Sequence, residues 1–286
     1  MPAVSPYLAD TAENLSVDGP SATFTYRRIG PPGGVPLVLL NRFRGTIDWW
    51  DPEFLDHLAA ERDVIVFDDI GVGYTTGAAR DSVEGFADGA IEFVEALGLA
   101  QVDLLGWTLG GIVAQHVARR RPDLVRKLVL AASNVDGQVP GAPGPDEQVR
   151  RILAKPEVTA DDLVHLFFPE TDAGRAAGHD YLARVAGRLA TGRPGVSEAA
   201  ATAQFTAIGK SAAVPLEQAR ADLAAIEQPV LYGAGMKDAM IPALTAYAAV
   251  QHLPDATLLV YGDSGHAFLF QHAKDFAAQV TTFLAA

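Results

Sequence analysis

The residues best suited to carry out chemistry lie in the segment Gly106-Trp107-Thr108-Leu109-Gly110-Gly111. A buried strand is predicted to run into this segment, and a helix is predicted to leave it directly. Glycines two residues before and after Thr108 allow a very tight turn, because larger side chains would collide there. Such a turn pushes the hydroxyl of Thr108 above the sheet. It also aims the amide of Leu109 at the same place, at the start of a helix. The spacing therefore predicts a nucleophile beside an amide that can bind an oxyanion.

Six short runs of Val, Leu and Ile are predicted to form a parallel sheet that is buried on both faces. The runs are residues 36–40, 64–68, 102–106, 127–133, 229–235 and 257–262. Residues 22–30 alternate more in polarity and are predicted to be an antiparallel edge strand. Residues 81–99, 109–120 and 267 to the C-terminus have helical periodicity. Because strands and helices alternate, the expected fold class is α/β, with a mostly parallel central sheet flanked by helices.

This alternation breaks between residues 137 and 227. A loop rich in Pro and Gly is followed there by amphipathic helical stretches with no strand-like run. We predict a helical cap, or lid, at 137–227, inserted into an α/β core made of 1–136 and 228–286. Its candidate pocket walls are Leu166, Phe167, Phe168, Tyr181 and Phe205, of which Phe168 is assigned to substrate binding.

Five motifs, in sequence order, resemble the α/β-hydrolase fold superfamily over almost the whole chain apart from the cap. They occupy residues 36–45, 64–77, 106–111, 229–242 and 262–270. In the family these positions hold the oxyanion loop, a D-x-x-G-x-G-x-S turn, the nucleophile elbow, the triad acid and the triad base. The resemblance implies a catalytic triad of Thr108, His266 and Asp238. It also implies an oxyanion hole formed by the backbone amides of Phe43 and Leu109.

The chain departs from the family pattern at Thr108, which stands where relatives carry Ser. A Thr hydroxyl is a comparable nucleophile once a base has removed its proton. Its methyl group, however, restricts χ1 and crowds the path of attack.

The second departure is Asn41-Arg42, where relatives usually carry His-Gly. We predict that Asn41, Arg42 and Trp107 bind the substrate. The positive charges of Arg42 and Arg44 indicate a substrate with a carboxylate or phenolate. Asp48 is interpreted either as a partner of these arginines or as part of an exposed surface pair.

Several functions remain open. A working triad hydrolyses an ester, a lactone or a C–C acyl bond through an acyl-enzyme. Alternatively, His266 and Asp238 act as a general base while the oxyanion hole stabilises an enolate, with no covalent step. Lyases, isomerases or epimerases and cofactor-independent oxygenases of the superfamily work in this way. A ligand-binding member without catalysis, or an engineered inactive Ser-to-Thr variant, is a further alternative.

Composition limits the partners. The net charge is −13, which disfavours nucleic acid and anionic membranes because both carry phosphates. The chain has no cysteine, and its histidines lack the spacing of a metal site. No dinucleotide fingerprint or P-loop is present, so no cofactor is expected. The N-terminus lacks the features of a signal peptide, and no apolar run is long enough to span a membrane. We therefore expect a cytoplasmic monomer or homodimer that acts on a small molecule.

Overall fold

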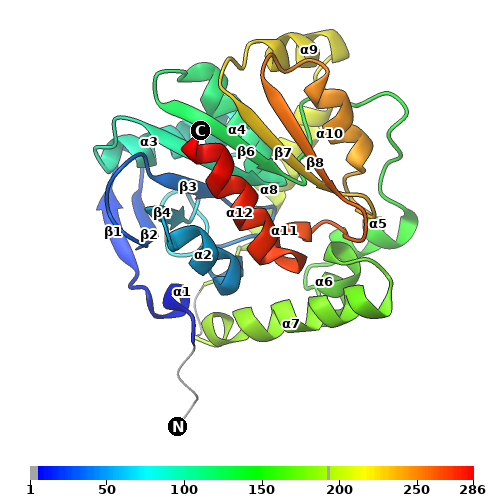
Figure 1. Ribbon diagram of the computed structural model, residues 1–286, viewed down its shortest axis with the longest axis horizontal. Coiled ribbons are helices and arrows are strands. Elements are labelled where there is room, and N and C mark those ends of the chain that lie inside the picture. Colours follow the sequence, from blue (N-terminus) through cyan, green and yellow to red (C-terminus); the bar gives the residue numbers. More distant parts are fainter. Residues whose placement is uncertain (1–5, 192–193) are drawn as a thin grey trace.

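The computed structural model describes residues 6–191 and 194–286, in which one sheet of eight strands forms the centre of the fold (Figure 1). The strand order is β1-β2-β4-β3-β5-β6-β7-β8. The strands are β1 (Leu15–Asp18), β2 (Thr23–Ile29), β3 (Leu37–Leu40), β4 (Val64–Phe67), β5 (Val102–Trp107), β6 (Val125–Ala131), β7 (Val230–Gly235) and β8 (Ala256–Tyr261). The pairs from β4 to β8 are parallel, and β1 and β2 are antiparallel additions.

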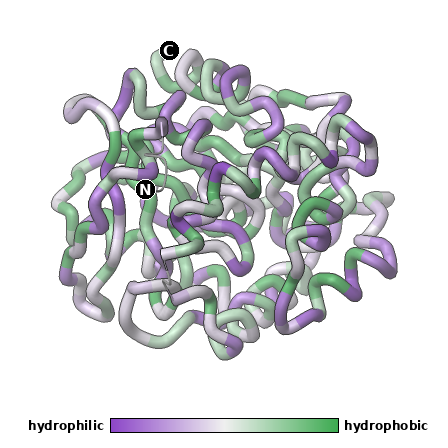
Figure 2. The backbone as a smooth tube through the Cα atoms, turned by 90° about the horizontal axis from the view of Figure 1, so that it is seen from below, coloured by the Kyte–Doolittle hydropathy of each residue, from purple (hydrophilic) through white to green (hydrophobic). Residues whose placement is uncertain are grey.

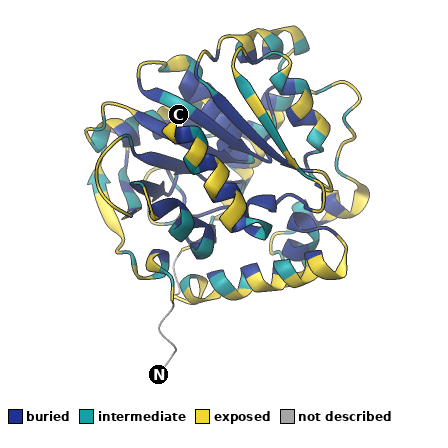
Figure 3. Cartoon of the chain, in the orientation of Figure 1, coloured by how far each residue is buried: buried dark blue, intermediate teal, exposed yellow. Residues whose placement is uncertain are grey.

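The central strands are buried on both faces, which is why their sequences read as continuous apolar runs. In β3, Leu37 and Leu39 enter the core on one side of the sheet, and Val38 and Leu40 enter the core on the other. Figure 3 shows the inner strands almost entirely buried, whereas exposed residues lie on the outer strands. The predicted α/β class with a mostly parallel sheet is confirmed.

Helices cover both faces of this sheet. The helices outside the predicted cap are α1 (Leu8–Thr11), α2 (Pro52–Ala59), α3 (Val83–Ala96), α4 (Leu109–Arg120), α10 (Ala243–Val250), α11 (Phe268–Gln271) and α12 (Ala273–Ala285), with a 3-10 turn at Ile47–Trp49. Helices α2 and α12 pack on one face, and α3, α4 and α10 pack on the other (Figure 1). In Figure 2 the colour changes repeatedly between hydrophobic and hydrophilic along the helical turns, as amphipathic helices require. No described helix is both long and apolar enough to cross a bilayer.

Two sequence expectations need correction. Residues 22–30 contain β2, which is antiparallel as predicted, but β1 lies outside it, so β2 is not the edge strand. The sequence concealed β1 because the strand has only four residues, three of which are exposed. The C-terminal helix is also not continuous. It divides into α11 and α12 at His272, whose backbone leaves the helical region.

The insertion at 137–227 leaves the sheet after β6 and returns to β7. These two strands are direct neighbours, with Ala131 opposite Gly233. The insertion contains α5 (Glu147–Leu153), α6 (Ala160–Phe167), α7 (Asp172–Leu189), α8 (Glu198–Ala212) and α9 (Leu216–Ala224), and its described residues include no strand.

Polar contacts attach the insertion to the rest of the chain, and two of them involve buried carboxylates. Arg184 of α7 forms an ion pair with Asp51, the N-cap of α2, at 2.6 Å between Nη2 and Oδ2. On the other side, Ser211 of α8 donates to Oδ1 of Asp136 at 2.7 Å, and Oδ2 of the same carboxylate lies 2.6 Å from Nε2 of His116.

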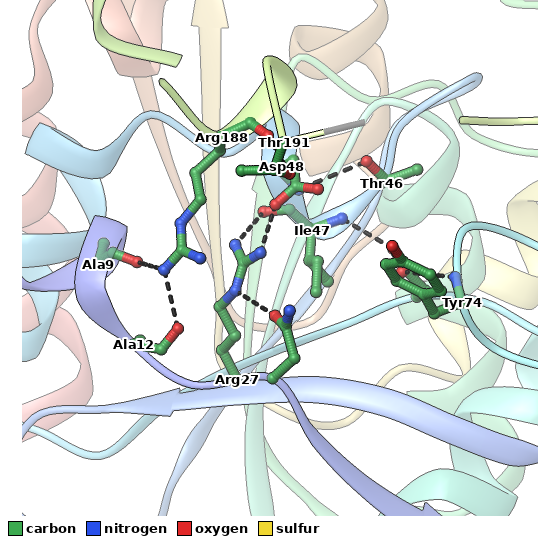
Figure 4. Close-up of polar contacts among 11 residues, drawn as sticks. Ala9, Ala12, Arg27, Thr46, Ile47, Asp48, Tyr74, Arg188 and Thr191 are labelled. Atoms are coloured by element: carbon green, nitrogen blue, oxygen red, sulfur yellow. Dashed lines mark hydrogen bonds and ion pairs between the residues drawn. The ribbon is translucent and has the colours of Figure 1, made fainter. Parts of the chain in front are cut away.

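The loop that follows β3 is fixed by a second polar network (Figure 4). Arg27 of β2 forms a buried ion pair with Asp48. Asp68, after β4, accepts from the amide of Ile47 at 2.8 Å and from the amide of Tyr74 at 3.3 Å. The interpretation of Asp48 is therefore corrected: its partner is Arg27 rather than Arg42 or Arg44, and the pair is buried. The network holds the turn after β4 and the loop after β3 together.

Candidate active site

Thr108 occupies a strained turn between β5 and α4. Its backbone angles are φ 52° and ψ −109°, which a β-branched residue rarely adopts. Backbone strain of this kind costs about 1–3 kcal/mol and persists only where surrounding contacts enforce it. Those contacts are close: a Cβ added at Gly106 would lie 2.3 Å from the carbonyl oxygen of Gly110. The glycines of the motif therefore allow β5 and α4 to meet, and Thr108 is raised from the sheet between them.

The amides of Leu109, next to Thr108, and of Phe43, in the same cavity lining, have no hydrogen-bond acceptor among the described residues. Leu109 is the first residue of α4, so its amide has no acceptor within the helix. Phe43 lies in the loop after β3, and its neighbours Arg44 and Gly45 donate to Gln204 and Arg42. Within the described residues, neither the Phe43 amide nor the Leu109 amide has an acceptor. Free donors at a helix N-terminus are suited to bind an oxyanion.

His266 and Asp238 form a buried pair at the carboxyl end of the sheet. Nδ1 of His266 lies 2.7 Å from Oδ2 of Asp238, and both side chains are 1% exposed. The second oxygen of Asp238 accepts from the amides of Met240 and Ile241 at 2.8 and 2.9 Å. These bonds fix the carboxylate, and the carboxylate in turn fixes the orientation of the imidazole ring. The other ring nitrogen, Nε2, is therefore left to act on a substrate.

Thr108 and His266 open into one cavity of about 210 Å³. Side chains of the loop after β3 line it, together with the insertion and the loops after β6 and β7. The lining residues are Arg42, Phe43, Arg44, Trp49, Thr108, Asn134, Pro145, Leu153, Val158, Leu163, Leu166, Phe167, Ile208, Met240, Ile241 and His266. Most of the residues in this wall are apolar.

Three residues predicted to bind substrate lie outside this lining. Asn41 donates to the carbonyl of Phe67 at 2.7 Å and accepts from the indole of Trp50 at 2.8 Å, so its amide is fully engaged in the core. Trp107 is 1% exposed and donates to the carbonyl of His266 at 3.3 Å. Phe168 follows the last residue of α6, where the backbone becomes extended, and its ring packs against Tyr181. These side chains support the wall rather than form it.

Of the remaining cap candidates, Leu166 and Phe167 line the cavity. Tyr181 is buried and donates to the carbonyl of Trp49 at 2.8 Å, whereas Phe205 is 61% exposed.

The cavity wall also includes Asn134, Met240 and Ile241, which were not predicted from the sequence. A positional signal was available, because each follows the carboxyl end of a strand, β6 or β7. Met240 and Ile241 also provide the amides that hold Asp238.

Asp69 is a buried carboxyl in the turn after β4. Burial, reinforced by the neighbouring charge of Asp68, raises the pKa of Asp69 to about 7. The folded state thus holds a proton on Asp69 that the unfolded state releases near pH 4. The stability that this bound proton provides is fully present at low pH. It is lost as the pH rises towards 7.

We therefore expect Asp69→Asn to be more stable than the wild type at pH 8, by an amount on the order of 2 kcal/mol. The difference should shrink at pH 5, as measured by denaturant titration at both pH values. Asp255→Asn, at an exposed position, is the control and should show no such pH dependence. Equal stability of wild type and Asp69→Asn at pH 8 would contradict the prediction.

No group of His, Asp and Glu side chains suited to hold a metal ion occurs among residues 6–191 and 194–286. The chemistry available at this site is that of a hydroxyl, an imidazole held by a carboxylate, two backbone amides without an acceptor, and two arginines.

Comparison with known proteins places this geometry in a family. A family model described as the alpha/beta hydrolase fold matches residues 35–273. The chain is 32% identical over 228 residues to 2-hydroxymuconate semialdehyde hydrolase of Pseudomonas putida, which covers 78% of this chain and 77% of that protein. It is 30% identical to the enzyme of the same name from Pseudomonas sp. strain CF600, covering 88% of this chain and 87% of that one.

Among solved structures, an alpha/beta hydrolase fold protein from Chitinophaga pinensis matches with a TM-score of 0.86 and 29% identity, over 96% of this chain and 98% of that one. The relatives in the sequence comparison include hydrolases that cleave C–C and ester bonds, which agrees with the site described above. The extent of these matches shows that the chain belongs to the α/β-hydrolase fold family of enzymes.

Proposed function

We propose that this enzyme hydrolyses an ester, lactone or C–C acyl bond in a small carbonyl compound, with Thr108 as nucleophile, His266 as base and Asp238 as the residue that orients the base. One observation carries the proposal: a buried His–Asp pair at 2.7 Å and a hydroxyl on a strained turn share one cavity. The hydrolase relatives and the small volume of the cavity support the same reading.

In the first half-reaction, Nε2 of His266 removes the proton of Thr108 as its oxygen attacks the carbonyl carbon. Asp238 holds the tautomer that leaves Nε2 free and stabilises the imidazolium that forms. The amides of Phe43 and Leu109 donate to the developing oxyanion. Collapse of the tetrahedral intermediate breaks the bond to the leaving group, to which His266 returns the proton.

In the second half-reaction, His266 activates a water molecule that attacks the acyl group on Thr108. The same amides stabilise the second oxyanion, the acid is released, and Thr108 regains its proton. The apolar wall contributed by the insertion limits the entry of further water, which strengthens the electrostatic interactions at the reacting carbon.

A second candidate function is proton transfer without an acyl-enzyme, as in a lyase, isomerase or epimerase, or a cofactor-independent oxygenase. One observation favours it: within the described residues, Oγ1 of Thr108 has no hydrogen bond to His266. In this function the His266–Asp238 pair removes a proton next to a carbonyl, the two amides hold the enolate, and Thr108 orients the substrate.

Covalent labelling with a fluorophosphonate, read by intact-protein mass, separates the two functions. We expect the wild type to gain one adduct, Thr108→Ala to gain none, and Thr108→Ser to label at least about tenfold faster because it lacks the crowding methyl. Thr202→Ala, at an exposed position of α8, is the matched control and should label like the wild type.

An unlabelled wild type together with a labelled Thr108→Ser variant would contradict acyl transfer. It would show that the base and the oxyanion hole are competent but that the native reaction has no covalent step. Screening would then turn to proton transfer and isomerisation. A ligand-binding protein without catalysis would leave both forms unlabelled.

A further inference from the structure

Arg42 is a buried cation in the cavity with no counter-ion. Its side chain is 6% exposed, and within the described residues no carboxylate lies in ion-pair distance of it. Nη1 donates to the carbonyl of Phe43 at 2.6 Å, whereas Nε has no acceptor. Burial lowers the pKa of Arg42 only to about 10, so the guanidinium remains charged at neutral pH.

Three other arginines, one buried and two partly exposed, have carboxylate partners in the structure. Arg27 pairs with Asp48, Arg184 pairs with Asp51, and Arg126 reaches Asp103. A buried charge without a partner is costly, and the charge at Arg42 can be satisfied by a ligand. Because Arg42 lines the same cavity as Thr108 and His266, that ligand is the substrate.

Aromatic rings hold this guanidinium in place. Its central carbon lies 4.9 Å from the ring centre of Trp49, 5.0 Å from that of Phe167 and 5.6 Å from that of Trp107. Contacts of this kind stabilise a cation through the faces of the rings and supply no hydrogen-bond acceptor. The N–H groups of Arg42 that do not donate to Phe43 thus keep their capacity to bind an anion in a fixed orientation.

Arg44, the second cation of this loop, is engaged elsewhere. Its Nη1 donates to the carbonyl of Lys155 at 2.7 Å, and its amide donates to Gln204 at 2.9 Å. These bonds tie Arg44 to the insertion. Arg44 therefore joins two segments of the chain, whereas Arg42 is left to bind a ligand.

From these contacts we infer that Arg42 binds a carboxylate of the substrate, so that the enzyme acts on short carbonyl compounds bearing one carboxylate. Arg44 also lines the cavity, but its guanidinium donates to the insertion, so Arg42 is the arginine left to meet an anion. One guanidinium matches a monoanion better than a phosphate dianion, and its plane matches that of a carboxylate. That the bound molecule is a substrate rests on the proposed function at Thr108. That Arg42 binds a carboxylate does not depend on that function.

The test is a binding measurement that needs no turnover. The three tryptophans of the chain are Trp49, Trp50 and Trp107, and two of them contact Arg42, so intrinsic fluorescence reports occupancy of this site. The probes are butanoate, hexanoate and octanoate, each compared with its neutral amide. For the best chain length we expect the wild type to bind the carboxylate at least about tenfold more tightly than the amide.

Variants assign the preference to one side chain. Arg42→Gln should reduce the preference for carboxylate over amide to less than about threefold. Arg42→Lys should keep part of it, because the charge remains. Arg44→Gln tests the second arginine of the cavity wall and should keep the wild-type preference, because its guanidinium donates to the insertion. Arg151→Gln, at an exposed position outside the cavity, is the matched control and should also keep it.

Three results would overturn the inference: equal binding of carboxylate and amide by the wild type, no binding of any carboxylate in the series, or a preference lost in Arg44→Gln and kept in Arg42→Gln. The wild-type comparison stands even if Arg42→Gln fails to fold. Failure of fluorophosphonate labelling with the carboxylate preference intact would refute the acyl-transfer mechanism alone.

Discussion

His266→Ala is expected to lower kcat/KM on a chromogenic short-chain ester by about a thousandfold to ten-thousandfold. No other base faces Thr108 in the described cavity lining, so the variant retains the oxyanion amides but cannot activate the hydroxyl. Asp238→Asn should lose about a hundredfold or more, because an amide at this position no longer fixes the tautomer that His266 needs.

The matched control for this experiment is His272→Ala. His272 also bonds an aspartate, with Nε2 at 2.9 Å from Oδ1 of Asp263, but this pair is near the surface and outside the cavity. Its kcat/KM should stay within about twofold of the wild type, as for most surface substitutions. If His266→Ala kept more than a tenth of the activity, His266 would not be the base of this reaction.

Gly110→Ala is expected to destabilise the fold by about 4 kcal/mol or more, although the change adds a single methyl group. A Cβ at Gly110 would lie 2.2 Å from the carbonyl oxygen of Leu40 and 2.8 Å from that of Asn41. Both are backbone atoms at the end of β3, so neither can move without displacing the strand and the loop that holds Arg42. Thermal unfolding should show a fall of roughly 8–15 °C in Tm.

Gly187→Ala provides the contrast. Gly187 is exposed within α7, and a Cβ there meets nothing within 4 Å. Alanine in the interior of a helix is favoured over glycine by about 0.5–1 kcal/mol, so this variant should be slightly more stable than the wild type. A Gly110→Ala variant that melts like the wild type would show that β3 and α4 can separate without cost.

The sequence predicted the buried part of the fold well and the exposed part poorly. The parallel strands were found because their Val, Leu and Ile runs are long and continuous. Strand β1 was missed because it lies at the edge of the sheet, where most of its residues are exposed and need not be apolar. A single helix was expected from residue 267 because no Gly or Pro marks the break at His272, where α11 ends and α12 begins.

For the candidate site, local motifs indicated which residues approach one another, and the structure brings His266 and Asp238 into hydrogen-bond contact. The burial of Arg42 was not predictable, because Trp49, Phe167 and Trp107 come from three separate segments that meet only in the folded chain. The difference between Phe167 and Phe168 depends on the residue at which α6 ends, which hydrophobic composition does not specify.

The position of the insertion between β6 and β7 makes it exchangeable. These strands are hydrogen-bonded neighbours, so the insertion starts and finishes at adjacent points, and its replacement would leave the register of the sheet unchanged. Seven of the cavity-lining residues, Pro145 to Phe167 and Ile208, belong to it, whereas Thr108, His266 and Arg42 do not. Grafting a different insertion, with the contacts to Asp51 and Asp136 retained, would therefore alter the shape of the accepted molecule while preserving the reacting groups. Under the proposed function, the shape of the substrate and the bond that is cleaved would thus be set by different parts of the chain.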